Sequence, residues 1–150
     1  MDKKLTYKAT QLEQMLSSLN KSITKHAKKL SKIAPDDHEA HEELDMFRDS
    51  IIQRLEYSVD HFWKSIKTYL EIAHGVAINE NGPKSIARTA TLHRIISEQE
   101  SDALIDMVER RNKTSHIYKE EVADEFAKYA PKALAFMKTV LERLLKNISK

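Results

Sequence analysis

An arginine, a histidine and a tyrosine close together in the sequence have side chains suited to chemistry on a phosphodiester. They lie in the segment Arg111 to Tyr118, which reads Arg-Asn-Lys-Thr-Ser-His-Ile-Tyr. Arg111 continues an apolar helical stripe through Leu104 and Met107, and a charge there needs a partner or an anionic ligand, because burying an unpaired charge is very costly. A guanidinium binds phosphate, and the imidazole of His116 can transfer protons near neutral pH. The segment is therefore a candidate site for phosphodiester chemistry.

One continuous helix does not bring the two groups together. At about 100° per residue, His116 lies about 140° round the helix from Arg111. The two side chains can converge if the helix frays near Ser115, or if two copies of the segment meet across a two-fold axis. Asn112 lies four residues before His116 on the same face, where its amide can orient the imidazole. In an extended segment, Tyr118 and His116 would point the same way.

This segment resembles the Arg-x4-His-x-Tyr motif of HEPN-domain proteins. Upstream, the stretches Arg48 to Tyr57 and Phe62 to Lys67 resemble the long helix of one HEPN subfamily, the nucleotidyltransferase substrate-binding proteins. Members of that subfamily are encoded beside a minimal nucleotidyltransferase, and the pair acts as a toxin–antitoxin system. The resemblance follows the helix order from about residue 5 to residue 148. Leu104 departs from it, because the family often has a tryptophan near this position, which affects packing and not chemistry.

The resemblance implies a metal-independent endoribonuclease, in which an arginine and a histidine from two subunits of a homodimer form one composite cleft. On this basis Arg111 would bind the phosphate, His116 would act as acid and base, and Asn112 would position the imidazole. The expected products are a 2′,3′-cyclic phosphate and a 5′-hydroxyl. No cofactor and no metal is expected.

Three basic residues near the motif, Arg110, Lys113 and Lys119, form the expected RNA-binding patch. The resemblance also implies that a partner nucleotidyltransferase, the antitoxin, transfers AMP groups to Tyr118. Phosphates added beside Arg111 would fill its anion site and repel RNA, which would switch the toxin off.

Two other interpretations stay open. The chain is alternatively a non-catalytic substrate-binding or docking subunit of the nucleotidyltransferase, in which Arg111 and His116 bind a nucleotide phosphate. It is otherwise a plain helical interaction domain, in which Arg111 pairs with Glu109 or with an acidic residue on another helix, and His116 caps the end of its own helix. Loss of RNA cleavage on His116→Ala separates the first interpretation from the others.

A second group of polar residues has spacings of three and four, as metal ligands on a helix do: His38, His41, Glu42 and Asp45. A solvated, acidic helix start explains them equally well. Because no second cluster closes a coordination sphere, no metal site is predicted here.

Length and composition indicate one helical domain spanning residues 1–150. Net charge is only +2, so RNA binding rests on a local patch and not on bulk charge. The chain has no cysteine, which agrees with a reducing cytoplasm. Its N-terminus lacks the apolar stretch of a signal peptide, and no apolar run approaches the length of a membrane span.

Apolar residues recur at steps of three and four through most of the chain, which predicts an all-α, up-and-down bundle of four long helices and a short one. The long helices are expected over about residues 5–33, from about 36 to 73, from 97 through the motif, and from 119 to 148 with an interruption or restart at Pro131. The short helix is expected over 84–96.

Capping-box patterns open two of these helices, Asp36 with Glu39 and Ser97 with Glu100. The second helix is apolar over so wide an arc that it should lie centrally, packed on more than one side. Its Arg48 and Gln53 are surface residues by their spacing, while the resemblance suggests that they line the site or the partner surface.

Overall fold

Five α-helices account for most of the chain. A computed structural model describes residues 2–79, 82–116 and 119–148, and this part contains no β-strand. No helix in the described part combines the length and hydropathy that a transmembrane span requires. The helices are α1 (Lys3–Lys32), α2 (His38–Ala73), α3 (Pro83–Leu92), α4 (Glu98–His116) and α5 (Glu120–Ile148).

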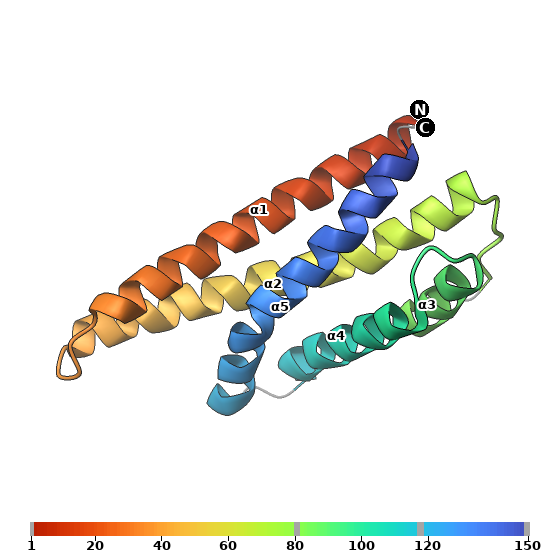
Figure 1. Ribbon diagram of the computed structural model, residues 1–150. Helices are drawn as coiled ribbons and strands as arrows, with labels where there is room; N and C mark the ends of the chain where they lie inside the picture. The colour runs from red at the N-terminus through yellow and green to blue at the C-terminus, as the bar shows by residue number, and fades with distance from the viewer. Residues whose placement is uncertain (1, 80–81, 117–118, 149–150) are drawn as a thin grey trace.

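The four long helices alternate in direction, and the short α3 lies between α2 and α4 in the sequence (Figure 1). The hairpin of α1 and α2 is the most extensive helix pair, and α5 packs against both of its members. In the described part of the chain α2 contacts all four other helices, whereas α1 does not contact α3 or α4. These contacts confirm the predicted all-α bundle with the second helix at its centre.

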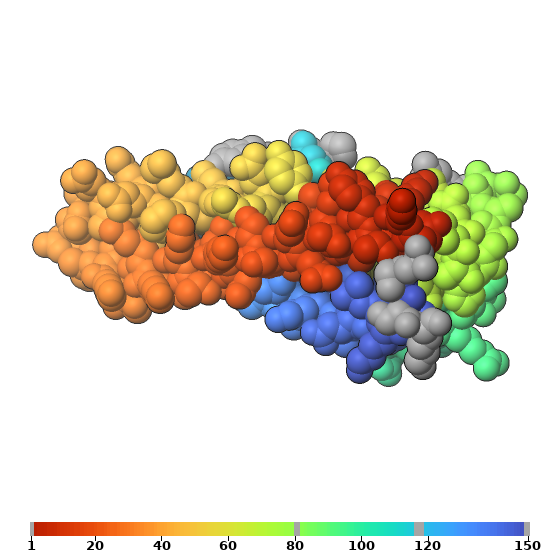
Figure 2. Space-filling view, turned by 90° about the horizontal axis from the view of Figure 1, so that it is seen from above, coloured from red at the N-terminus to blue at the C-terminus, as the bar shows by residue number. Residues whose placement is uncertain are grey.

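The far end of the α1–α2 hairpin extends beyond the rest of the bundle (Figures 1 and 2). The first part of the apolar stripe on α1 is buried, with Leu12 and Leu19 both fully covered. Near the end of α1, Leu30 is 53% exposed, and Met46 on the facing part of α2 is 70% exposed. The apolar stripe of α1 therefore continues beyond the part of the helix that packs in the core. Its members up to Leu19 are buried, and Ile23 is partly buried against them.

The start of α2 differs by one residue from the predicted capping box. Asp37 and not Asp36 is the N-cap, and its carboxylate accepts a hydrogen bond from the Ala40 N–H at 3.1 Å. Asp36 lies in the turn before it. The two adjacent aspartates are chemically equivalent caps, so composition alone did not separate them.

The short helix α3 ends at Leu92, four residues earlier than predicted. Arg94 has a φ of 58°, in the left-handed region, and the Ile95 N–H bonds back to the Ala90 carbonyl at 2.9 Å. This turn places Ile95 and Ile96 in the core although neither is helical. The apolar spacing that suggested a longer helix therefore reflects burial of a loop.

The predicted capping box at the start of α4 is confirmed. The Glu100 N–H donates to the Ser97 hydroxyl at 3.1 Å, and the Ser97 N–H donates to the Glu100 carboxylate at 2.9 Å. Arg143 of α5 binds both oxygens of the same carboxylate at 2.8 Å. The start of α4 is therefore fixed before the helix reaches the motif.

Pro131 lies within α5, which runs continuously past it and changes direction in Figure 1.

Candidate functional site

The buried face of α4 places Arg111 at the edge of the core. Leu104 and Met107 are completely buried, and Arg111 follows one turn later on the same face. There the core ends, and the guanidinium meets two carboxylates of α2 instead of another apolar side chain. The predicted need of this charge for a partner is met within the chain.

Asp60 and Glu56 hold Arg111 from one face of α2. Arg111 Nε and Nη2 donate to the two oxygens of Asp60 at 3.1 and 3.2 Å, and Nη1 donates to Glu56 at 2.9 Å. The side chain of Arg111 is 20% exposed. The hydrogen bond to Asp60 raises the pKa of Arg111, so the guanidinium stays charged. This is an ion pair with another helix, as the interaction-domain interpretation allowed.

Two hydroxyls of α4 complete the arrangement. The Ser115 hydroxyl accepts from Arg111 Nη1 at 3.1 Å, and the Thr114 hydroxyl lies 3.0 Å from the same Glu56 oxygen. Of the five N–H groups of a guanidinium, these contacts use the one on Nε, both on Nη1 and one on Nη2. Among the described residues, the second N–H on Nη2 has no further partner.

The helix does not fray before His116. α4 is continuous through Ser115 to His116, so the alternative in which fraying brings Arg111 and His116 together is wrong. Ideal helical spacing places positions 111 and 116 about 140° apart around the helix axis. The side chain of His116 and the whole of Tyr118 lie outside the described residues.

Of the predicted RNA-binding residues, Arg110 and Lys113 line one groove and Lys119 lines a second, and Val122 lines both. Asn112 is exposed, and its carbonyl accepts from the Ser115 hydroxyl at 3.0 Å. Arg110 binds Asp106 at 2.9 Å and lies 4.4 Å from the centre of the Tyr129 ring. Lys113 shares a groove of about 220 Å³ with Arg110 and three acidic residues. Lys119 lies in a different groove.

The groove that contains Lys119 has a volume of about 210 Å³. It lies between α2 and the start of α5, at the end of α4. Asp49, Gln53 and Lys119 are its exposed polar residues, and Glu56 joins it to the Arg111 cluster. Gln53 thus lines a cavity that Thr114 of the motif also lines. The full lining is Asp49, Ile52, Gln53, Glu56, Thr114, Lys119, Val122 and Ala123.

The expectation that Arg48 is a surface residue is wrong. Its side chain is 7% exposed, and Nη1 lies 2.6 Å from Glu120 and 2.9 Å from Asp124 at the start of α5. Asp49 is a further partner at 3.1 Å. The hydrogen bond to Glu120 raises the pKa of Arg48. The pattern of α2 alone gave no sign of the contact with α5, because Glu120 and Asp124 lie over 70 residues away from Arg48 in the sequence.

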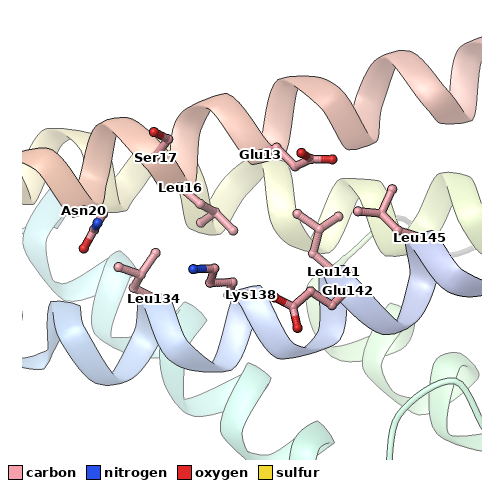
Figure 3. Close-up of a pocket in the computed structure, with 9 residues that line it drawn as sticks. All are labelled: Glu13, Leu16, Ser17, Asn20, Leu134, Lys138, Leu141, Glu142 and Leu145. Atoms are coloured by element: carbon pink, nitrogen blue, oxygen red, sulfur yellow. The ribbon is translucent and has the colours of Figure 1, made fainter.

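A third groove, of about 300 Å³, separates α1 from α5 and contains no residue of the motif. In Figure 3, Leu16 of α1 and Leu141 of α5 lie in the space between the helices, with Glu13 and Lys138 nearby. Within the described residues, no group of three or more histidine, aspartate or glutamate side chains is arranged to hold a metal ion.

The partners of Arg111 were missed in the sequence. Glu56 and Asp60 are four residues apart, which places both carboxylates on one face of a helix. Two acids at that spacing next to an apolar stripe are a signal that a cation from another helix packs between them. Nothing in the sequence specified which cation.

The sequence matches the family described as nucleotidyltransferase substrate binding protein like over residues 7–146. The chain belongs to this family, which confirms the resemblance drawn from the motif and the α2 stretches. No curated protein sequence matches the chain.

Several solved structures are similar to this chain. A Thermus thermophilus protein is 27% identical, with a TM-score of 0.61 over 84% of this chain and 98% of its own. A toxin–antitoxin with AMP-PNP is 14% identical, with a TM-score of 0.70 over 96% and 99%. The tri-AMPylated Shewanella oneidensis HEPN toxin in complex with MNT antitoxin is 14% identical, with a TM-score of 0.71 over 97% and 99%. The last two share the fold of this chain.

Proposed function

We propose that this chain is the HEPN toxin of a toxin–antitoxin pair, a homodimeric and metal-independent endoribonuclease whose partner is a minimal nucleotidyltransferase. The single observation that carries the proposal is the Arg-x4-His-x-Tyr motif, from Arg111 to Tyr118, at the end of α4 in a chain of this family. A similar fold in a HEPN toxin that is complexed with an MNT antitoxin supports the partner.

The continuous helix favours a site built from two chains. Because α4 runs unbroken to His116, Arg111 of one chain and His116 of the same chain diverge. Arg111 of one chain can instead face His116 of a second across a two-fold axis near the ends of the two α4 helices. His116 then moves protons to and from the ribose oxygens, Asn112 positions its imidazole, and Arg111 binds the phosphate.

Arg111 needs help to attract an anion. One guanidinium lies between two carboxylates, Glu56 and Asp60, so this cluster is negative and not positive. The remaining N–H of Nη2 gives direction to a phosphate contact, while the exposed Lys113 and Lys119 supply positive charge. AMP groups on Tyr118 would bring phosphates to the same region and exclude RNA, so the nucleotidyltransferase acts as antitoxin.

Incubation of the purified chain with a mixed RNA pool in EDTA tests this function. We expect wild type to leave 2′,3′-cyclic phosphate ends and His116→Ala and Arg111→Ala to leave RNA intact, with Lys132→Ala as an exposed control that cleaves normally. Intact mass first shows that the preparation carries no AMP. Cleavage by His116→Ala at the wild-type rate would refute the assignment.

The antitoxin step has its own test. Incubation with the partner nucleotidyltransferase and ATP should add the mass of AMP to wild type and not to Tyr118→Phe, and cleavage should stop only where mass is added. A Tyr118→Phe chain that gains the same mass would place the modification elsewhere.

The neutralised Arg111 favours a second candidate, a docking subunit that presents a substrate to the nucleotidyltransferase and cuts nothing. A guanidinium already held by Glu56 and Asp60 is a good structural link and a weak anion site. Absence of cleavage by unmodified wild type, together with stable co-purification with the nucleotidyltransferase, would favour this candidate over the nuclease.

A further inference from the structure

The groove between α2 and the start of α5 has the make-up of a nucleotide site. Ile52, Val122 and Ala123 give it apolar walls, and Gln53 and Lys119 are exposed at it. Its volume of about 210 Å³ is below the roughly 300 Å³ at which pockets for drug-sized ligands begin. It therefore suits one planar base, with the sugar and phosphate lying outside.

Each acidic residue of this groove accepts a hydrogen bond from an arginine that other acids share. Asp49 accepts from Arg48 at 3.1 Å, and Glu56 accepts from Arg111 at 2.9 Å and from the Thr114 hydroxyl at 3.0 Å. Lys119 is exposed and has no ion pair among the described residues. A phosphate at the mouth of the groove would meet Lys119, while both carboxylates of the groove already accept hydrogen bonds.

Gln53 contributes a carboxamide to the lining of this groove. Its Nε2 donates to the Tyr57 hydroxyl at 3.2 Å, which leaves one N–H and the carbonyl oxygen for a ligand. An adjacent donor and acceptor on a carboxamide pair with the amino group and ring nitrogen of adenine. Tyr57 lies one turn further along α2, is 55% exposed and is not part of the groove lining.

We infer that this groove binds an adenine nucleotide, with the base paired to Gln53 between the apolar walls and the phosphate at Lys119. The inference deepens the proposed function and rests on it for the origin of the ligand. That origin is either an adenosine of the RNA or an adenylyl group from the nucleotidyltransferase reaction. Binding itself requires no cleavage.

Titration of the full-length chain with AMP, GMP, CMP and UMP in EDTA, followed by calorimetry or amide NMR shifts, tests the inference. We expect AMP to bind most tightly, with shifts at residues 49–56 and 119–123. Gln53→Leu should weaken AMP binding by about tenfold or more and abolish the preference for adenine. Lys119→Ala should weaken binding of AMP but not of adenosine.

The chain offers a matched control for the amide. Gln11 of α1 also donates to a tyrosine hydroxyl four residues away, that of Tyr7, at 3.0 Å. Gln11→Leu removes the same kind of contact far from the groove in sequence and should leave AMP binding unchanged. Equal affinity for all four nucleotides, no binding at millimolar AMP, or equal effects of Gln53→Leu and Gln11→Leu would overturn the inference.

Two further arms identify the source and separate the proposals. An uncleavable 2′-O-methyl oligoadenylate that binds more tightly than AMP indicates an adenosine within RNA, while tighter AMP binding indicates the adenylyl group. A chain that binds AMP through Gln53 but cuts no RNA refutes the nuclease proposal and supports the adenine-nucleotide groove. A chain that cuts RNA but shows no preferential AMP binding refutes the adenine-nucleotide groove and supports the nuclease.

Discussion

Arg111 and Asp60 form a two-bond contact between α4 and α2. Arg111 Nε and Nη2 each donate to one oxygen of the Asp60 carboxylate, at 3.1 and 3.2 Å, although the residues are 51 positions apart in the chain. A parallel pair of bonds fixes the plane of the guanidinium as well as its position. Arg111 is therefore oriented before any ligand or second chain arrives.

Replacing Asp60 should lower stability more than replacing an exposed acid does. Asp60→Asn removes a charge from a contact that is partly shielded from water, and we expect the free energy of unfolding to fall by about 1–2 kcal/mol in urea denaturation. Asp106→Asn is the control, because Asp106 binds Arg110 within the exposed surface of α4. Its loss should be at most about 0.5 kcal/mol. Equal losses would count against the Arg111–Asp60 pair.

Removing the partners of Arg48 should cost more than removing Arg48 itself. The arginine is 7% exposed, whereas Glu120 and Asp124 are 64% and 51% exposed. The double change Glu120→Gln and Asp124→Asn leaves the buried Arg48 with Asp49 at 3.1 Å and Asp45 at 3.8 Å as its acidic partners, and we expect a loss of about 2 kcal/mol. Arg48→Met leaves carboxylates that water still solvates, so we expect about 1 kcal/mol less stability.

Urea denaturation of both variants measures this difference, with Arg88→Met as an exposed control in α3. Hydrogen exchange should also show faster opening of the first turns of α5 in the double variant. A larger loss for Arg48→Met would mean that the arginine contributes mainly by packing.

The pair of Glu100 and Arg143 predicts a specific pH dependence. The hydrogen bond from Arg143 lowers the pKa of Glu100 below its ordinary value of 4.5. A lowered pKa in the folded state gives stability that is present above the unfolded pKa and is lost as pH falls through the folded pKa. Glu100→Gln should therefore cost about 1–2 kcal/mol at pH 7, and this difference from wild type should shrink below pH 4.5.

Glutamine at position 100 keeps an oxygen that can accept from the Ser97 N–H. The variant therefore removes the carboxylate charge and leaves the hydrogen bond of the helix cap in place. Glu98→Gln in the same turn is the control and should change stability little at either pH. A Glu100→Gln difference that stays constant with pH would show that the carboxylate charge contributes nothing.

Periodic apolar residues predicted the helices well, because burial of one face decides where a helix forms. The same reasoning failed where a single local contact decides the outcome. Arg94 turns the chain out of α3, and the cap of α2 is one aspartate and not its neighbour. Arg48 and Arg111 show the same limit for the site, since each pairs with acids that only the tertiary fold brings near.

Gly75 should resist substitution more than Gly82 does. Gly75 has a φ of +63°, and the Val76 N–H beyond it bonds to the Leu70 carbonyl at 3.1 Å to close the end of α2. A side chain there costs about 1–2 kcal/mol because the left-handed region is strained for L-residues. Gly82 is extended at a φ of −134°, and neither glycine has an atom within 4 Å of an added Cβ.

We therefore expect Gly75→Ala to lower the melting temperature more than Gly82→Ala does. Gly82 is the N-cap of α3, where alanine is a poorer cap than glycine, so a small decrease is expected there as well. Equal melting temperatures for the two variants would contradict the left-handed turn.

Mixing two inactive variants should restore RNA cleavage if the proposed site is shared between chains. Arg111→Ala lacks the phosphate contact and His116→Ala lacks the acid–base group, and the unbroken α4 keeps the two residues of one chain apart. In a mixed dimer, one of the two sites receives an intact arginine and an intact histidine from different chains. Random pairing makes about half of the dimers mixed, so activity should reach about a quarter of wild type. The rate should rise after joint unfolding and refolding and stay at zero for each variant alone. No recovery, with mixed dimers verified by mass, would mean that each chain uses its own Arg111 and His116.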